Sequence, residues 1–379
     1  MPHSKMLQTT RWIYLMKIKL TALNLREALS QVSKMVSKGS HNPILTHVLL
    51  ELSDGFIEFT GKNDSMQKTV KIECNADVDC FAIAIEFTKL YNLCKSLQDE
   101  KIVTISIEDE KAKLSCGKSK ITLSTLPAAD FPSFESGEMK QIEVPIEEII
   151  TGIDYVASSA GKDHPRRCVN SVVLASDGVT FDVVATSGAK LSVYSIKSNV
   201  APMSIIIPIK SVAAVKEGLM SCLTAGYCNN SIVIKGDNSI LYVSVLDEKF
   251  VQYKAAIPTG EIRHKLTFSK ENIVDSLGRI SIIADDPKTS RCSIDSKAGV
   301  SDAIIVGKLL SGSGNQITES FPIDNESEYD LSVSYNPQYL LDSINKMAEE
   351  KVTCSIYGDK KIIVLKSGNF TSVITQVLI

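Results

Sequence analysis

The chain has 379 residues, of which 41 are basic and 44 are acidic, so its formal net charge is −3. This near balance excludes a uniformly basic nucleic-acid binder, but it allows a basic surface confined to one face. Hydrophobic residues make up 44% of the chain and charged residues 22%, as in globular proteins, and the length suffices for two or three domains. No apolar run is long enough to cross a membrane.

The first fifteen residues contain the only tryptophan of the chain. Their apolar run, from Trp12 to Met16, is too short for the core of a signal peptide. They also precede the first copy of a repeated phrase, which begins at Lys17. We therefore treat residues 1–15 as an extension outside the fold and expect Met16 to be the true start.

A strand followed by an amphipathic helix occurs three times along the chain. The copies read KIKLTALNLREALSQVSKM, QIEVPIEEIITGIDYVASS and HKLTFSKENIVDSLGRISII. Leu25, Ile149 and Ile273 correspond, because 149 − 25 = 124 and 273 − 149 = 124. A period this long, with the phase of the helix kept, indicates three copies of one domain rather than a solenoid of short repeats.

Each repeat contains a second strand–helix unit followed by β-rich sequence. The three units read CFAIAIEFTKLYNLCKSL, SIIIPIKSVAAVKEGLM and LSVSYNPQYLLDSINKM, and short β-branched runs separated by turn residues follow each of them. Two helices packed on antiparallel sheets make an α+β domain. We predict three such domains, over residues 16–140, 141–262 and 263–379.

No pattern in the sequence points to a catalytic or metal centre. The nine cysteines form no CxxC pair or Cys/His cluster with zinc-ligand spacing. The GKS at Gly117 lacks the first glycine of a P-loop, since Ala112 occupies that position. We interpret the cysteines as small buried residues in a reducing compartment. The prediction is a cytoplasmic protein without enzymatic activity, cofactor or metal ion.

Two longer stretches resemble a known family. LPAADFPSF at 126–134 is similar to the phrase that closes the first domain of the bacterial sliding clamp, the β subunit of DNA polymerase III. RRCVNSVVLASDGVTFDVVATSGAKLSVYSI at 166–196 is similar to the segment of its second domain that carries an ATDGHRL-like motif. NPIL at 42–45 and SIIIPIKSV at 204–212 also match. The resemblance covers residues 16–379 and agrees with the threefold repeat.

This resemblance implies a head-to-tail homodimer in which six clamp domains form a ring. Helices would line the hole and sheets would form the outer scaffold. Such a ring encircles double-stranded DNA without reading its sequence, and it tethers a DNA polymerase subunit, the clamp loader and other proteins that carry clamp-binding peptides. A sliding protein should touch phosphates rather than bases, and topological linkage supplies the retention that tight binding would otherwise provide.

The resemblance and the helix patterns together suggest residues for two surfaces of the ring. Ile282 and Ile283 would lie at the dimer interface by resemblance. Nine basic residues, eight on solvent faces of the helices and one in a segment that approaches DNA in relatives, are candidates to face DNA; each has an ordinary solvated surface as its alternative. They are Lys34, Lys38, Lys89, Lys95, Arg167, Lys210, Lys216, Arg279 and Lys346.

A peptide-binding groove between the second and third domains is also implied by the resemblance. Its walls would be Val169, Thr186, Gly188, Lys190, Leu191, Val251, Ala256, Tyr339, Ile362, Val373 and Val377. The motif departs from the family where a His-Arg pair has become Ala189-Lys190, and the last five residues read TQVLI instead of an MPMRL-like tail. A lysine cannot stack or form forked hydrogen bonds as arginine does, so we expect an altered partner preference.

Two other classes of protein remain as alternatives at this stage. The first is a scaffold of three α+β domains that does not encircle DNA. The second is an enzyme with a site between domains, against which the missing catalytic residues argue. The mass and shape of the particle in solution separate a dimeric ring from a monomeric scaffold.

Overall fold

The structure is a computed structural model that describes residues 16–39, 41–77, 80–108, 111–134, 137–282, 291–308, 316–327, 329–358 and 361–377. By its contacts the chain divides into two compact units. The first unit comprises Met1–Gln141 and Ser221–Ser244, and the second comprises Ile142–Met220 and Val245–Ile379. The predicted second domain, residues 141–262, is therefore shared between the units, and the predicted extension lies outside the described residues.

The first unit contains two helices and an antiparallel sheet in which the described strands run β10-β15-β16-β17-β4-β3-β2-β6-β9-β8-β7-β1-β5. The helices are α1 (Ala22–Val32) and α2 (Phe87–Lys95). The strands are β1 (Met16–Thr21), β2 (His47–Ser53), β3 (Phe56–Lys62), β4 (Met66–Glu73), β5 (Asn75–Ala76), β6 (Cys80–Glu86), β7 (Ile102–Glu108), β8 (Lys111–Cys116), β9 (Ser119–Pro127), β10 (Lys140–Gln141), β15 (Thr224–Cys228), β16 (Ser231–Lys235) and β17 (Ser239–Ser244).

Among its described residues, the second unit contains four helices and an antiparallel sheet in the order β14-β11-β12-β13-β25-β24-β23-β18-β21-β20-β19-β22. Its helices are α3 (Ile146–Val156), α4 (Ile209–Leu219), α5 (Lys270–Ile282) and α6 (Pro337–Ile344). Its strands are β11 (Ser171–Ser176), β12 (Thr180–Thr186), β13 (Lys190–Lys197), β14 (Met203–Pro208), β18 (Ile262–Ser269), β19 (Arg291–Ser296), β20 (Asp302–Lys308), β21 (Gln316–Asn325), β22 (Leu331–Tyr335), β23 (Lys351–Tyr357), β24 (Ile362–Ser367) and β25 (Phe370–Ile374).

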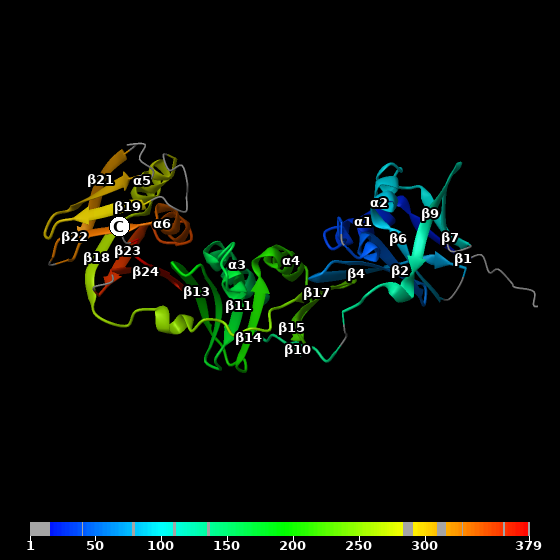
Figure 1. Ribbon diagram of the computed structural model, residues 1–379, viewed down its shortest axis with the longest axis horizontal. Helices are drawn as coiled ribbons and strands as arrows, with labels where there is room; N and C mark the ends of the chain where they lie inside the picture. The colour runs from blue at the N-terminus through cyan, green and yellow to red at the C-terminus, as the bar shows by residue number, and fades with distance from the viewer. Residues whose placement is uncertain are drawn as a thin grey trace, which may run out of the picture. The chain divides into compact units, whose positions relative to one another are not determined.

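The helices pack in pairs, each pair on its own part of a sheet. Helix α1 contacts α2, α3 contacts α4 and α5 contacts α6. Helix α3 lies on β12 and β13, and α4 lies on β11 and β14 (Figure 1). The apolar positions that define the repeat are all buried in these helices: Leu25, Leu29, Ile149, Ile153, Ile273 and Leu277. Burial of one apolar stripe per helix is what the sequence period requires, and the predicted α+β fold is confirmed.

Consecutive repeats are joined by the same kind of strand pair. Strand β4 pairs with β17, with Met66 opposite Val243. Strand β13 pairs with β25, with Lys190 opposite Ile374. Because 190 − 66 = 124, β4 and β13 use equivalent positions of successive repeats, and their partners Val243 and Ile374 both lie on the last strand of the following repeat. Each junction continues a sheet by backbone hydrogen bonds, which covers an edge strand that would otherwise be unpaired.

Within the described part of the chain, no helix is long and apolar enough to cross a membrane. All nine cysteines lie in that part and are free thiols, of which Cys94, Cys168, Cys228, Cys292 and Cys354 are buried. No group of three or more His, Cys, Asp or Glu side chains among the described residues is arranged to hold a metal ion.

Candidate functional site

A hollow of about 760 Å³ lies in the second unit beside the turn between β12 and β13. Eight of the eleven predicted groove residues line it: Val169, Thr186, Gly188, Leu191, Val251, Ala256, Ile362 and Val373. Eight further lining residues were not predicted from the sequence: His164, Arg166, Ala189, Gln252, Tyr253, Ala255, Pro258 and Thr375. Residues that are widely separated along the chain thus meet around one cavity.

The floor of this hollow is an apolar cluster from several elements. Val169, from the 3-10 turn η4 (Arg167–Asn170), and Leu191, Val193 and Val373 are buried in the cluster. The partly buried rings of Phe250 and Tyr253 pack against it. An open apolar floor of this kind provides binding energy for apolar side chains, while a few polar groups at the rim orient a ligand.

The rim of the hollow is shaped by the tight turn between β12 and β13. Gly188 has a φ of +91°, a conformation that residues with a Cβ rarely adopt, although a Cβ there would meet no other atom within 4 Å. The Thr186 hydroxyl accepts a hydrogen bond from the Gly188 amide at 3.0 Å and donates to the Lys190 carbonyl at 2.8 Å. The glycine is therefore required by the backbone of the turn.

Lys190 is one of three predicted groove residues that lie away from the hollow. Successive side chains of a strand point to opposite faces of the sheet, so Leu191 faces the cavity while Lys190 faces the other side. There the Lys190 ammonium is 2% exposed and lies 3.8 Å from the Asp342 carboxylate. Burial, together with the nearby charge of Lys346, lowers the pKa of Lys190 to about 8.

The other two are Tyr339 and Val377. Tyr339 is on α6 and packs against the hydrophobic core of the third repeat. The Val377 amide donates a hydrogen bond to the Ser334 carbonyl at 2.8 Å, next to β22. Nearer the cavity, the Thr375 amide donates to the Ala189 carbonyl at 3.0 Å. The C-terminal segment thus reaches the hollow at Thr375.

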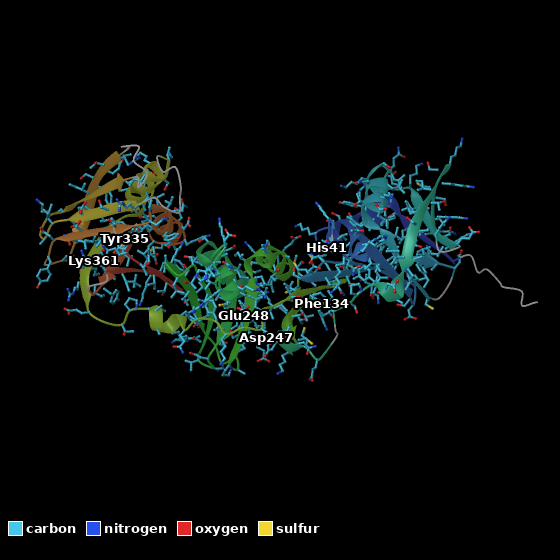
Figure 2. The ribbon with its side chains drawn as sticks, viewed as in Figure 1. His41, Phe134, Asp247, Glu248, Tyr335 and Lys361 are labelled. Carbon is cyan, nitrogen blue, oxygen red and sulfur yellow. The ribbon has the colours of Figure 1, made fainter. Side chains whose placement is uncertain are left out.

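One side of the hollow carries the positive charge of Arg166. His164 also lines it, and none of the described lining residues is a carboxylate. Arg166 and Val251 also line an adjoining hollow of about 500 Å³, to which Arg167, Glu248 and Lys249 contribute. Glu248 lies beside Asp247 in the segment that follows β17 (Figure 2). The arrangement suits a ligand with apolar anchors and a neutral or acidic flank.

Comparison with known proteins shows which proteins this chain resembles. Residues 16–135 match the family described as "DNA polymerase III beta subunit, N-terminal domain". The chain is 25% identical to the beta sliding clamp of Escherichia coli K12 over 354 residues, which covers 89% of this chain and 92% of the relative. It is also 25% identical to the beta sliding clamp of Buchnera aphidicola over 361 residues, covering 93% and 96%.

Solved structures of DNA polymerase III subunit beta have the same fold as this chain. The DNA polymerase III subunit beta from Pseudomonas aeruginosa superimposes with a TM-score of 0.86 at 20% identity, covering 96% of this chain and 100% of that chain. A second P. aeruginosa structure, bound to griselimycin, gives a TM-score of 0.84 at 19% identity, with the same coverage. The chain is thus similar to bacterial β sliding clamps over most of its length. The resemblance predicted from the sequence is confirmed.

In this clamp, the nine basic residues predicted to face DNA lie on or next to helices. Lys34 and Lys38 follow α1, Lys89 and Lys95 are on α2, Lys210 and Lys216 are on α4, Arg279 is on α5, Lys346 follows α6, and Arg167 is in η4. Seven of them are exposed, while Lys216 and Lys346 are half-buried. Their approach to DNA stays a prediction.

Three of these cations already carry carboxylate partners. Lys89 lies 2.6 Å from Glu86, and Lys216 lies 2.6 Å from Asp154. Arg279 donates two hydrogen bonds to Glu319, at 2.8 and 2.9 Å. These hydrogen bonds raise the pKa of Arg279 and lower that of Glu319. A phosphate that approaches these helices therefore competes with carboxylates of the clamp itself.

Of the two residues predicted at the dimer interface, Ile282 ends α5 and is 81% exposed. It is therefore not a core residue. Ile283 lies outside the described residues. The interface role of both stays a prediction, which the exposure of a large apolar side chain supports.

Proposed function

We propose that two copies of this clamp join head to tail into a ring that encircles double-stranded DNA, slides along it and tethers a DNA polymerase and other proteins. The ring is a processivity factor without catalytic activity and acts in the cytoplasm. The observation that carries the proposal is the repeated strand junction. Two junctions lie within the chain, and a third, equivalent one requires a second copy.

The two strands that would form the third junction each have a free edge. Strand β9 pairs with β8 over residues 119–124, but with β6 only over 125–127. Strand β21 pairs with β20 over residues 316–322, but with β18 only over 323–325. Within the described chain, residues 119–124 and 316–322 are thus left unpaired on one edge. Free edges of this kind are templates for pairing with another chain.

The strand pairing in the repeats predicts the register of this third junction. Ser239, the first residue of β17, lies opposite Val70, and Phe370, the first residue of β25, lies opposite Tyr194. Within its own sheet Tyr194 lies opposite Val183 and contacts Glu148 of α3, and the equivalent residue of the third repeat is Glu319, which lies opposite Ile305 and contacts Arg279 of α5. Ser119 is the first residue of β9. We therefore expect Glu319 of one copy to lie opposite Ser119 of the other.

A cysteine cross-link tests both the ring and its register. A variant with Ser119→Cys and Glu319→Cys should form disulfide-linked dimers under mild oxidation, because directly opposed residues of antiparallel strands are close enough to bridge. The matched control carries Lys120→Cys with Glu319→Cys, which places the two thiols on opposite faces of the sheet. Wild-type protein controls for the native thiols. A particle with the mass of one chain, or equal cross-linking in the control, contradicts this interface.

Retention on DNA separates the ring from the scaffold alternative. A ring loaded onto nicked circular DNA should stay bound after transfer to high salt and should be released when the circle is linearised. Salt screens phosphate contacts but does not break topological linkage. A scaffold that does not encircle DNA would be lost from both DNA forms at high salt.

The groove supports the tethering part of the proposal. We expect a Gln-Leu-Phe-type peptide to bind with its apolar side chains on the floor formed by Val169, Leu191 and Val373. The variant Ala256→Glu adds a charge at an exposed position of the lining. It should weaken binding about tenfold or more, because the bound peptide would cover the new carboxylate and leave it buried without a partner, which is costly. Ala213→Glu, at an exposed position on α4, is the control. Equal binding by both variants would place the groove elsewhere.

A further inference from the structure

One wall of the groove is a segment that belongs to neither sheet. Residues 251–258 belong to the second unit and precede β18, and six of them line the hollow. Among the described residues, the backbone hydrogen bonds that its amides donate are local, such as Tyr253 to Val251 at 2.8 Å and Ala255 to Gln252 at 3.1 Å. They form the 3-10 turn η5 (Tyr253–Ala256). The segment must therefore be held in place by its side chains.

Two consecutive side chains of the segment are fastened to β12 and to the turn before it. The Tyr253 hydroxyl donates a hydrogen bond to the Asp182 carboxylate at 2.6 Å. The Lys254 ammonium donates to Asp177 at 2.6 Å and to the Thr180 hydroxyl at 3.1 Å. It also lies 3.2 Å from Asp182. Asp177 in turn accepts hydrogen bonds from the backbone amides of residues 179 and 180, which fix the turn.

Asp182 is the centre of this attachment. It is 2% exposed, and its second oxygen accepts a hydrogen bond from the Ser195 hydroxyl at 2.5 Å. A buried carboxylate is tolerated only when hydrogen bonds and a positive charge compensate for lost hydration. Tyr253 and Lys254 supply that compensation, so Asp182 favours the conformation in which both are docked. Asp182 itself does not line the hollow, whereas the ring of Tyr253 does.

We propose that Asp182 is a positioning residue for partner binding. By holding the Tyr253 hydroxyl, it keeps residues 251–258 in place as a preformed wall of the groove before a peptide arrives. When a wall of the binding site is ordered before the peptide arrives, the free-energy cost of ordering it does not reduce the affinity. This inference rests on the proposed function of the groove.

The variants Tyr253→Phe and Asp182→Asn test the attachment at its two ends. Tyr253→Phe keeps the ring that lines the groove and removes only the hydroxyl. The matched control is Tyr335→Phe, because the Tyr335 hydroxyl also makes a short hydrogen bond, to the Lys361 carbonyl at 2.5 Å (Figure 2), but Tyr335 belongs to the core of the third repeat and does not line the hollow. If Asp182→Asn does not fold, Tyr253→Phe alone carries the test.

Two measurements are needed, one with a peptide and one without. Without a peptide, hydrogen exchange of residues 251–258 and tryptic cleavage after Lys254 should be faster in Tyr253→Phe and Asp182→Asn than in wild type or Tyr335→Phe. With a Gln-Leu-Phe-type peptide, the dissociation constant should rise about tenfold in these two variants, mainly through slower association. Saturating peptide should restore protection of the segment.

Several outcomes would overturn the inference. One is unchanged exchange and affinity in both variants, and another is an equal loss of affinity in Tyr335→Phe, which would indicate general destabilisation. Faster exchange without any change in affinity would show that the attachment is structural only. If wild-type protein binds no peptide, the proposed function of the groove fails and this inference fails with it; the exchange data then still report whether Asp182 holds the segment.

Discussion

Lys190 allows a direct test of how burial affects stability. Its ammonium group is buried beneath the groove, and no hydrogen-bonded carboxylate compensates for the lost hydration. Its side chain is 2% exposed, and its nearest carboxylate, Asp342, is 3.8 Å away, beyond hydrogen-bond distance. The pKa of Lys190 is about 8, compared with 10.5 for an exposed lysine. This difference corresponds to about 3 kcal/mol by which burial disfavours the charged form at neutral pH.

The replacement Lys190→Met keeps the length of the side chain and removes the charge. At pH 7 we expect the free energy of unfolding of the variant to be about 1–3 kcal/mol larger than that of wild type, so the variant is more stable, since the buried charge is gone. Asp342 tolerates the loss because it is 27% exposed and still accepts a hydrogen bond from the Gln338 amide at 2.7 Å.

The pH dependence of stability shows independently whether the charge on Lys190 destabilises the folded protein. Between about pH 8 and 10.5, unfolded wild-type chains bind a proton at Lys190 that folded chains do not, so wild-type stability rises with pH through this window. Below pH 8 the destabilisation is fully present. The advantage of Lys190→Met should therefore be constant up to about pH 8 and disappear by about pH 10.5.

Urea unfolding followed by circular dichroism at several pH values between 7 and 10.5 measures this difference. Subtracting the free energy of unfolding of wild type from that of Lys190→Met at each pH removes the contributions of titrating groups that the two proteins share. Lys366→Met, at an exposed position of β24, is the control for the replacement of a lysine by methionine. A difference between wild type and Lys190→Met that does not change with pH would refute the reasoning, as would a variant less stable than wild type at pH 7.

Three further predictions follow from other side chains. His264 is 8% exposed with no hydrogen-bond partner at Nδ1 among the described residues, and burial together with Lys361 and Arg263 lowers its pKa; stability should therefore fall as pH drops below about 6.5, and His264→Leu should flatten this slope in thermal melts. Ile282→Glu should give folded monomers by light scattering, and an intact dimer would remove Ile282 from the interface. Replacing Lys38 and Lys210, both exposed, by Glu should slow loading onto primed circular DNA more than replacing Lys89 and Lys216, whose charges are already paired with Glu86 and Asp154; equal effects would show that these ion pairs do not matter.

The sequence predicted the helices and the repeat well because both depend on a regular apolar pattern. Leu25, Ile149 and Ile273 are buried at equivalent positions, as a period of 124 residues requires. The domain boundaries are less visible in the sequence. Residues 221–244 lie in the first unit through pairing of β17 with β4, and strand pairing between distant segments leaves no local pattern.

The groove was predicted by position along the chain, and this explains where the prediction departs from the structure. Leu191 faces the cavity, but Lys190 cannot, because neighbouring residues of a strand point to opposite faces. Gly188 lines the cavity as predicted, and its φ of +91° shows that the turn itself needs glycine. Tyr253 was not predicted at all, since its role depends on Asp182, 71 residues away in sequence.

The ion pairs on the helices fit a clamp that holds DNA by enclosure. Lys89, Lys216 and Arg279 each have a carboxylate within 3 Å, so their attraction for phosphates is reduced at close range. For a protein that binds DNA only by its charges, such pairing would lower affinity with no compensating gain. For a closed ring, retention does not depend on these contacts, and weaker contacts lower the barriers between successive positions on the duplex. The same pairing that would weaken an open DNA-binding protein is therefore compatible with a ring that slides.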